Sequence, residues 1–399
     1  MLLAALLGAG SLAGCSLIPG SASAGSASPT QTVPTPEPAN PLPAPAPKSR
    51  ATSSSTASAS AGPLEGWSLE EKVGQLIMVG VDAASPAKAS TDAVTSHHVG
   101  NIFIAGRSTA GKQETQKVIS SFTGKVDSTT THDTPMLVAT DQEGGDVQVM
   151  SGSGFSDIPS AMDQSTQPRE QLLASARTWG KELADVGATM NLAPVVDLVD
   201  VATPSTNEPI GRWGREYGRD AATVTAQAGA FAEGMKASGI IPVYKHFPGL
   251  GRVTANTDTA SGVTDTTTAR SGDAAVGIFA SAISGGAQVI MVSSATYSLI
   301  DPAAPAVFSS IVGTEMGFTG MVITDDVSAA AQVKDVPAGE RAVRAIRAGC
   351  DMVLASADPT LAADMAKALV STAQSDPAFA ARVDESVTRV LALKNSNQS

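Results

Sequence analysis

The segment of residues 240–258 contains the side chains best suited to chemistry. It begins with an apolar run that predicts a buried strand, and this strand delivers Lys245 and His246 side by side. A loop rich in glycine and proline follows directly. Burying a lysine and a histidine without partners is costly. The pair therefore indicates a binding or catalytic site rather than part of an apolar core.

Carboxylates stand at the ends of other apolar runs. Asp141, Asp197 and Asp325 each follow a run rich in Val, Ile, Leu or Met. In a parallel barrel, the carboxyl ends of all strands open on one face, where active sites are built. These side chains are therefore expected to converge on one pocket, although they lie far apart in the sequence.

Two of these positions offer a choice between neighbouring acids. At the first, Asp141 is the preferred acceptor of hydrogen bonds from substrate hydroxyls, and Glu143 is left open. At the second, adjacent residues of a strand point to opposite sides, so only one of Asp325 and Asp326 faces a ligand. Asp325 directly continues the strand and is the preferred nucleophile. Asp326 is expected to cap the next helix or to support the site from behind.

Arginines stand beside aromatic residues in the loop 211–218, with the sequence GRWGREYG. A guanidinium group can bind a carboxylate or the polar substituents of a sugar. Arg215 is the preferred binding residue, and Arg212 is the second candidate. Salt bridges within the loop are the alternative.

The fold that positions these residues is predicted from apolar runs that alternate with helical stretches. Continuous runs of Val, Ile, Leu and Met are typical of strands covered on both faces. Eight such strands over about 330 residues predict a single (β/α)8 TIM-type barrel, with a doubly wound open sheet as the alternative. The predicted strands are 75–81, 101–105, 135–140, 189–195, 241–246, 288–293, 320–325 and 351–355. The predicted helices are 169–186, 220–238, 269–284, 338–348, 360–374 and 377–394.

Composition and spacing exclude several classes of function. The net charge of −12 argues against nucleic acid as a partner. Residues 106–112 are close to a phosphate-binding P-loop, but Gln113 replaces the required Ser or Thr. The four histidines and two cysteines lack the spacing of a zinc site, and Cys350 is expected to be a small core residue. No metal or organic cofactor is expected.

The first 62 residues are expected to lie outside the folded domain. Residues 1–15 are apolar and end in Leu-Ala-Gly-Cys, which resembles the lipobox of a bacterial lipoprotein signal peptide with Cys15 as the lipidated residue. Residues 16–62, rich in Ser, Ala, Pro and Thr, predict a disordered linker. The barrel domain is then 63–399, and a lipid anchor would hold it on the extracytoplasmic face of the cell membrane.

The motifs of the folded part resemble glycoside hydrolase family 3, in its short single-domain branch of β-N-acetylglucosaminidases, or β-hexosaminidases. The resemblance extends from Ser68 to about Lys394 and covers nearly all of the predicted domain. Several motifs in the right order carry it: DQEGG from Asp141, NLAPVVD up to Asp197, KHFPG from Lys245, GFTGMVITDD up to Asp326, and AGCDM from Ala348.

The resemblance implies a retaining, exo-acting β-N-acetylhexosaminidase. Asp325 would attack the anomeric carbon and form a covalent glycosyl–enzyme, later hydrolysed with net retention. Asp141, Arg215, Lys245 and His246 would hold the hydroxyls and the ring of the sugar. For an enzyme on the outer face of the membrane, the implied substrate is β-linked GlcNAc in peptidoglycan fragments. We expect a monomer.

The chain departs from the family pattern at the residues expected to move protons. In this branch the loop reads KHFPGHG and is followed by Asp-Ser-His or Asp-Thr-His, whose Asp–His pair supplies the general acid/base. Here Leu250 and Ala260 occupy the two histidine positions, and Asp258 would act alone, or with a water or an outside acceptor such as phosphate. A carboxylic acid in that role needs a raised pKa. Three interpretations stay open: a hydrolase that uses Asp258 or another residue, a phosphorylase, and a non-catalytic lipoprotein that binds cell-wall glycan.

Overall fold

The computed structural model describes residues 63–311 and 317–397. The predictions for the lipobox with Cys15 and for the linker lie outside the described residues. Within the described part, no helix is both long enough and apolar enough to cross a membrane.

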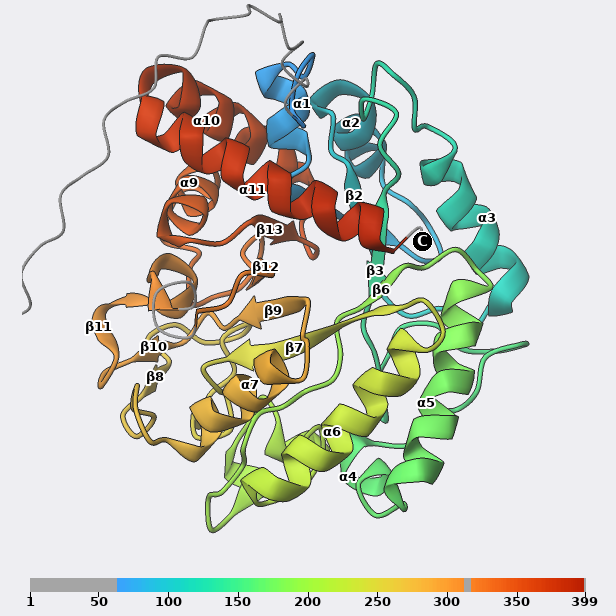
Figure 1. The fold of residues 1–399 in the computed structure, drawn as a ribbon, viewed down its shortest axis with the longest axis vertical. Helices are drawn as coiled ribbons and strands as arrows, with labels where there is room; N and C mark the ends of the chain where they lie inside the picture. Colours follow the sequence, from blue (N-terminus) through green and yellow to red (C-terminus); the bar gives the residue numbers. More distant parts are fainter. Residues whose placement is uncertain (1–62, 312–316, 398–399) are drawn as a thin grey trace, which may run out of the picture. The chain divides into compact units, whose positions relative to one another are not determined.

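A closed barrel of eight parallel strands forms the centre of the domain (Figure 1). Each barrel strand pairs with the next barrel strand along the chain, and the last pairs with the first. The predicted fold class is confirmed, and the open-sheet alternative is wrong. The barrel strands are β1 Ile77–Asp82, β2 Asn101–Ala105, β3 Leu137–Thr140, β6 Met190–Asn191, β7 Ile241–Phe247, β9 Val289–Val292, β12 Met321–Asp326 and β13 Met352–Ala355.

Each of the eight predicted segments overlaps a barrel strand, because burial on both faces produces the apolar runs seen in the sequence. β6 is shorter than predicted, since only Met190–Asn191 of residues 189–195 form strand. Pro194 has no N–H to donate to a ladder, which limits regular pairing here. Val195 still pairs with Lys245 of β7 through an isolated bridge. The segment therefore stays against the barrel although its strand is short.

Helices cover the outside of the barrel, and α5 and α6 lie side by side on it (Figure 1). Five of the six predicted helices begin within two residues of the predicted start. Cys350, which follows α9, is buried in the core as predicted. The helices are α1 Leu69–Gly74, α2 Lys88–His97, α3 Gly111–Thr123, α4 Ala161–Gln164, α5 Arg169–Ala184, α6 Ala221–Lys236, α7 Ala274–Ser284, α9 Ala338–Ala348, α10 Ala362–Ser375 and α11 Pro377–Ser396.

The helix α7 begins at Ala274, later than the predicted start at residue 269. Asp273 is its N-cap and accepts a hydrogen bond from the N–H of Ala275 at 2.9 Å. The same carboxylate accepts from the N–H of Ala269 at 3.0 Å and from Arg252 at 2.8 Å. These contacts favour a turn before the helix, and the sequence-based start was wrong because it ignored this cap.

Short elements at the carboxyl ends of the barrel strands build the walls around its open face. They were not predicted, because they lack the continuous apolar runs of the barrel strands. A hairpin of β4 Gln142–Gly144 and β5 Val147–Gln148 follows β3 directly. A separate three-stranded sheet consists of β8 Thr264–Asp265, β10 Thr296–Tyr297 and β11 Asp301–Pro305.

Candidate active site

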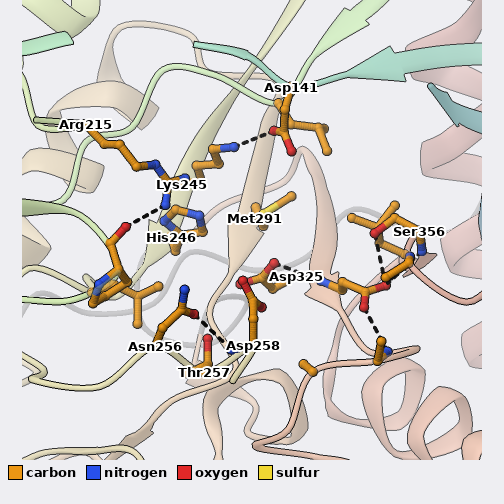
Figure 2. Close-up of a pocket in the computed structure, with 18 residues that line it drawn as sticks. Asp141, Arg215, Lys245, His246, Asn256, Thr257, Asp258, Met291, Asp325 and Ser356 are labelled. Carbon is orange, nitrogen blue, oxygen red and sulfur yellow. Dashed lines mark hydrogen bonds and ion pairs between the residues drawn. The ribbon is translucent and has the colours of Figure 1, made fainter. Parts of the chain in front are cut away.

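A pocket with a volume of about 410 Å³ opens among the carboxyl ends of the barrel strands. This is the face on which parallel barrels build their active sites. The structure brings all six predicted pocket residues to the wall of this one pocket (Figure 2). They are Asp141, Arg215, Lys245, His246, Asp258 and Asp325.

Lys245 lies at the centre of an ion-pair network on one side of the pocket. Its Nζ is 2.6 Å from Oδ1 of Asp141 and 2.6 Å from Oε1 of Glu143. Arg215 donates two hydrogen bonds to the Glu143 carboxylate, from Nε at 2.8 Å and from Nη2 at 2.7 Å. Bidentate pairs of this kind are short and directional. The network therefore fixes Lys245 and Arg215 in place before a ligand enters.

Glu143, left open by the sequence, is the buried anchor of this network. Its exposed fraction is 3%, and it is not among the residues that line the pocket. Burial alone would raise the pKa of Glu143, but Arg215 and Lys245 outweigh it and lower the pKa to about 2. Burial would likewise lower the pKa of Lys245, but Asp141 and Glu143 raise it. Glu143 and Lys245 are therefore both charged at neutral pH, and Glu143 supports the site from behind.

Asp197 holds His246; the sequence placed Asp197 near the pocket but assigned it no role. Its Oδ2 lies 2.7 Å from Nδ1 of His246, and its Oδ1 accepts from the backbone N–H groups of His246 at 3.1 Å and Leu250 at 2.8 Å. Because Nδ1 faces a buried carboxylate, Nδ1 carries a proton and Nε2 remains for other contacts. The sequence did place Asp197 at the end of an apolar run. That position alone does not separate a ligand-facing carboxylate from a supporting one.

Asp325 and Asp326, at the end of β12, have different surroundings. Asp326 accepts hydrogen bonds from the Ser328 hydroxyl, from the N–H of Ala329 and from Ser356. Among hydrogen bonds within the described residues, the Asp325 carboxylate accepts one, from the N–H of Asp326 at 2.8 Å. Asp326 thus holds loops together, while most of the acceptor capacity of Asp325 remains for a ligand.

The carboxyl groups of Asp258 and Asp325 lie next to one another in the pocket (Figure 2). Burial raises the pKa of Asp325, and attraction from His246 lowers it in part. Repulsion from Asp258 raises it further, and the resulting pKa is about 6. Asp258 is open to the solvent of the pocket. Even so, partial withdrawal of its carboxyl from bulk water and repulsion from Asp326 raise its pKa. Two such groups can hold one proton between them, so one acts as an acid while the other is a carboxylate.

Leu250 and Ala260, which stand where the family pattern has histidines, lie in different places relative to the pocket. Leu250 lines the pocket, and Ala260 does not. His246 is the one histidine among the described residues that line the pocket, and its Nδ1 is already bound to Asp197. In the described part of the chain, no histidine therefore hydrogen-bonds to Asp258 as the Asp–His pair of the family pattern would require.

Carboxyl groups outnumber basic groups around the pocket. The acids that line it or contact its basic residues are Asp141, Glu143, Asp197, Asp258, Asp325 and Asp326. The basic side chains that line it are Arg215, Lys245 and His246. This balance disfavours an anionic ligand and suits a neutral ligand with many hydroxyl groups. Within residues 63–311 and 317–397, no group of three or more His, Cys, Asp or Glu side chains is arranged to hold a metal ion.

Comparison with known proteins identifies the family. The model of the glycosyl hydrolase family 3 N terminal domain matches residues 68–393. Beta-hexosaminidase LpqI of Mycobacterium tuberculosis is 31% identical over 347 residues, which cover 83% of this chain and 84% of that protein. A beta-hexosaminidase of Stenotrophomonas maltophilia is 34% identical over 233 residues, which cover 55% of this chain and 67% of that protein.

Solved structures agree with this assignment. The beta-N-acetylhexosaminidase from Beutenbergia cavernae is 52% identical, with a TM-score of 0.81, and the match covers 82% of this chain and 99% of that one. A family 3 beta-N-acetylglucosaminidase from Paenibacillus is 28% identical, with a TM-score of 0.74, and the match covers 83% of this chain and 63% of that one. The chain therefore belongs to glycosyl hydrolase family 3 and is a hydrolase of O-glycosyl bonds.

Proposed function

We propose that the chain is a retaining, exo-acting β-N-acetylhexosaminidase that removes a terminal β-linked GlcNAc. The observation that carries the proposal is the pair of carboxyl groups of Asp258 and Asp325, which share one pocket and have raised pKa values. Retaining glycosidases use two nearby carboxyl groups, one as nucleophile and one as acid/base. The names of the relatives, beta-hexosaminidase and beta-N-acetylhexosaminidase, support the choice of sugar.

In the first step, a carboxylate oxygen of Asp325 attacks the anomeric carbon of the terminal sugar. The bond from this carbon to the glycosidic oxygen breaks, and the leaving oxygen takes the proton of Asp258. The sugar is then held as an ester of Asp325. The pKa values of both carboxyls are raised, which supports one proton shared by the pair at the start of this step, and the mechanism needs this proton on Asp258.

In the second step, a water attacks the same carbon from the side that the leaving group has vacated. Asp258, now a carboxylate, takes a proton from this water, and the ester bond to Asp325 breaks. Two inversions at the anomeric carbon give net retention. Both proton transfers are assigned to the Asp258 carboxyl alone, since within the described residues His246 is paired with Asp197 and no histidine hydrogen-bonds to Asp258.

The opposite wall of the pocket is proposed to hold the sugar. Asp141 has an exposed fraction of 29% and uses Oδ1 to bind Lys245, which leaves Oδ2 to accept a hydrogen bond from a sugar hydroxyl. His246 can offer Nε2 because Asp197 holds its Nδ1. Fixed donors and acceptors need no rearrangement as the sugar ring flattens toward the transition state.

An assay of the protein with p-nitrophenyl β-N-acetylglucosaminide, with and without phosphate, tests this function. Release of nitrophenol in phosphate-free buffer is the expected result, and the surplus of carboxylates supports water as the acceptor. Release that depends on phosphate and yields sugar 1-phosphate would indicate a phosphorylase instead. Binding of GlcNAc without turnover would indicate a non-catalytic glycan-binding protein.

The Asp258→Asn variant tests the acid/base assignment. Cleavage of a GlcNAc disaccharide, whose leaving group needs a proton, should fall by about 10²–10⁴-fold. Cleavage of a dinitrophenyl glycoside, whose leaving group needs no proton, should form the glycosyl–enzyme at a nearly unchanged rate. Added azide should restore turnover of the aryl glycoside by replacing the water. An equal loss on both substrates, without rescue, would assign the proton transfer to another residue.

The pH profile gives a second measure of the same pair. In the wild type, kcat/KM should fall at low pH, where both carboxyls of the pair hold protons, and at high pH, where the pair has lost its shared proton. The Asp258→Asn variant should lose the alkaline limb and keep one acid limb below about pH 6, because repulsion from Asp258 no longer raises the pKa of Asp325. The exposed Asp335→Asn, outside the pocket wall, is the control and should keep both limbs.

We further propose that the substrate is β-linked GlcNAc in peptidoglycan fragments and that a lipid on Cys15 holds the chain at the outer face of the cell membrane. The lipobox-like sequence and the Ser/Ala/Pro-rich residues 16–62 support this placement. Labelling with radioactive palmitate should mark the wild type but not Cys15→Ser. Release of GlcNAc from purified GlcNAc–MurNAc should be detectable. A negative result in either assay would remove that part and leave the glycosidase proposal intact.

A further inference from the structure

Asn256 begins the turn that carries Asp258. Its side-chain Oδ1 accepts a hydrogen bond from the backbone N–H of Asp258 at 2.9 Å. Its backbone oxygen accepts from the N–H groups of Thr259 at 3.2 Å and Ala260 at 2.9 Å. Asparagine often organises turns in this way, by bonding a backbone amide two residues ahead. The direction in which the Asp258 side chain points therefore depends on Asn256.

The same turn is tied to the segment that follows the nucleophile strand β12. The backbone oxygen of Asp258 accepts from the N–H of Ala331 at 3.1 Å, and that of Thr257 accepts from the N–H of Gln332 at 3.0 Å. The backbone of Asp258 is thus held on both sides: its N–H by the side chain of Asn256, and its carbonyl oxygen by the N–H of Ala331. These bonds set the position of the acid/base loop relative to the strand that carries Asp325.

The amide group of Asn256 can face only one way in this arrangement. Because Oδ1 is used by the N–H of Asp258, the Nδ2 group must point to the opposite side. Figure 2 shows this nitrogen turned toward His246 and the interior of the pocket, whose wall Asn256 forms in part. Within the part of the chain that the structure describes, Nδ2 has no hydrogen-bond acceptor. A fixed donor without an acceptor, in a pocket for a hydroxyl-rich ligand, indicates a contact with that ligand.

We propose that Asn256 is both a positioning residue for Asp258 and a binding residue for the substrate. Its Oδ1 sets the place of the Asp258 carboxyl, and its Nδ2 donates a hydrogen bond to a substrate oxygen near the scissile bond. This inference rests on the proposed function, because it assumes that Asp258 protonates the leaving oxygen. It adds a residue of this chain that neither the sequence pattern nor the ion-pair network identified.

Two variants separate the two roles. Asn256→Asp keeps an oxygen for the N–H of Asp258 but loses the donor. It should raise KM by about 3–10-fold. At the pH optimum of the variant, the ratio of kcat on the disaccharide to kcat on the dinitrophenyl glycoside should stay as in the wild type. Asn256→Ala loses both contacts. It should also lower kcat by about 10–100-fold for the disaccharide, with a much smaller loss for the dinitrophenyl glycoside, because the acid is then misplaced.

Thr259→Ala is the matched control. Thr259 is exposed on the same turn, and its hydroxyl makes only a 3.5 Å contact with the Asn256 backbone oxygen, so both kinetic constants should stay unchanged. The inference fails if Asn256→Ala shows equal losses on both substrates, or if Asn256→Asp leaves KM at the wild-type value. If Asp258→Asn loses as much activity on the dinitrophenyl glycoside as on the disaccharide, the proposed role of Asp258 is wrong, independently of Asn256. Melting temperatures near that of the wild type would show that each variant is folded.

Discussion

Asp325→Asn is expected to lower kcat on p-nitrophenyl β-N-acetylglucosaminide by about 10⁴-fold or more, on the scale seen when a catalytic nucleophile is removed. The amide has nearly the same shape as the carboxylate but cannot form the glycosyl ester. Asp325 accepts a single hydrogen bond within the described residues, from the N–H of Asp326, and the amide oxygen can keep it. The loss should therefore reflect chemistry rather than a change of fold.

A mechanism-based label gives an independent measurement of the same assignment. A fluorinated GlcNAc fluoride, which forms the ester quickly and hydrolyses slowly, should add one sugar mass to the wild type. Peptide mapping should place this mass on Asp325. Asp335→Asn should label normally, since Asp335 is exposed and outside the pocket wall. Label on Asp258, or a variant that keeps more than a tenth of the wild-type kcat, would contradict the assignment.

The same variant should be more stable than the wild type at pH 7. The pKa of Asp325 is raised from 3.8 to about 6 by burial and by repulsion from Asp258, so keeping it ionised costs the folded state free energy at neutral pH. With allowance for screening by pocket solvent, Asp325→Asn should raise the free energy of unfolding by about 1–2 kcal/mol at pH 7. The gain should shrink as the pH falls from 6 to 4, because the wild-type carboxyl then takes up its proton. Urea unfolding at pH 7 and pH 4 checks this, and an equal gain at both values would contradict it.

The positions that the sequence predicted best are those set by strand geometry. Lys245, His246 and Asp325 follow strands that are buried on both faces, and a parallel barrel brings such ends together without further information. Asp326 makes the supporting contacts expected of it, with Ser328 and Ser356, although it lines the pocket together with Asp325, which strand alternation did not predict. In these cases a local pattern and a regular fold were sufficient.

The pairing of charges could not be predicted in this way. Glu143 stands two residues after Asp141, but the irregular β4–β5 hairpin places Glu143 beneath the pocket and leaves Asp141 at its wall. Asp197 and Asp141 both follow apolar runs, and only the loop geometry decides that Asp197 holds His246. The turn headed by Asn256 was missed for the same reason. Loop conformation depends on many weak backbone hydrogen bonds, which leave no periodic signal in the sequence.

Glu143→Ala is expected to cost about 3–5 kcal/mol of the free energy of unfolding, because it leaves buried cations without their shared carboxylate. Lys245 keeps Asp141 at 2.6 Å. Arg215 keeps its hydrogen bond to the backbone oxygen of Pro209 at 2.8 Å. Among the described ion pairs, Glu143 is its carboxylate partner, so most of the loss in stability comes from the unpaired Arg215 guanidinium. Glu143→Gln keeps the shape and one acceptor oxygen, and should cost about 2–3 kcal/mol. Urea unfolding at pH 7 measures both.

The matched control is Glu114→Ala, which removes a pair of similar length in an exposed place. Glu114 lies 2.7 Å from Lys117, and both side chains are more than half exposed. Its loss should therefore cost only about 0–0.5 kcal/mol. If Glu143→Ala cost no more than this control, Glu143 would not be the anchor of Lys245 and Arg215.

The pH dependence decides whether the charge of Glu143 or its packing carries the effect. The pKa of Glu143 falls from 4.5 to about 2 on folding, so its stabilising effect is complete above about pH 4.5 and is lost as the pH falls through 2. The difference between the wild type and Glu143→Gln should therefore be equal at pH 7 and pH 5 and smaller at pH 3. The variant should also raise KM more than it lowers kcat, because Arg215 and Lys245 then lose the partner that orients them toward the sugar. A difference that does not change between pH 7 and pH 3 would assign the effect to packing alone, and the network would then not be an electrostatic support of the sugar-binding wall.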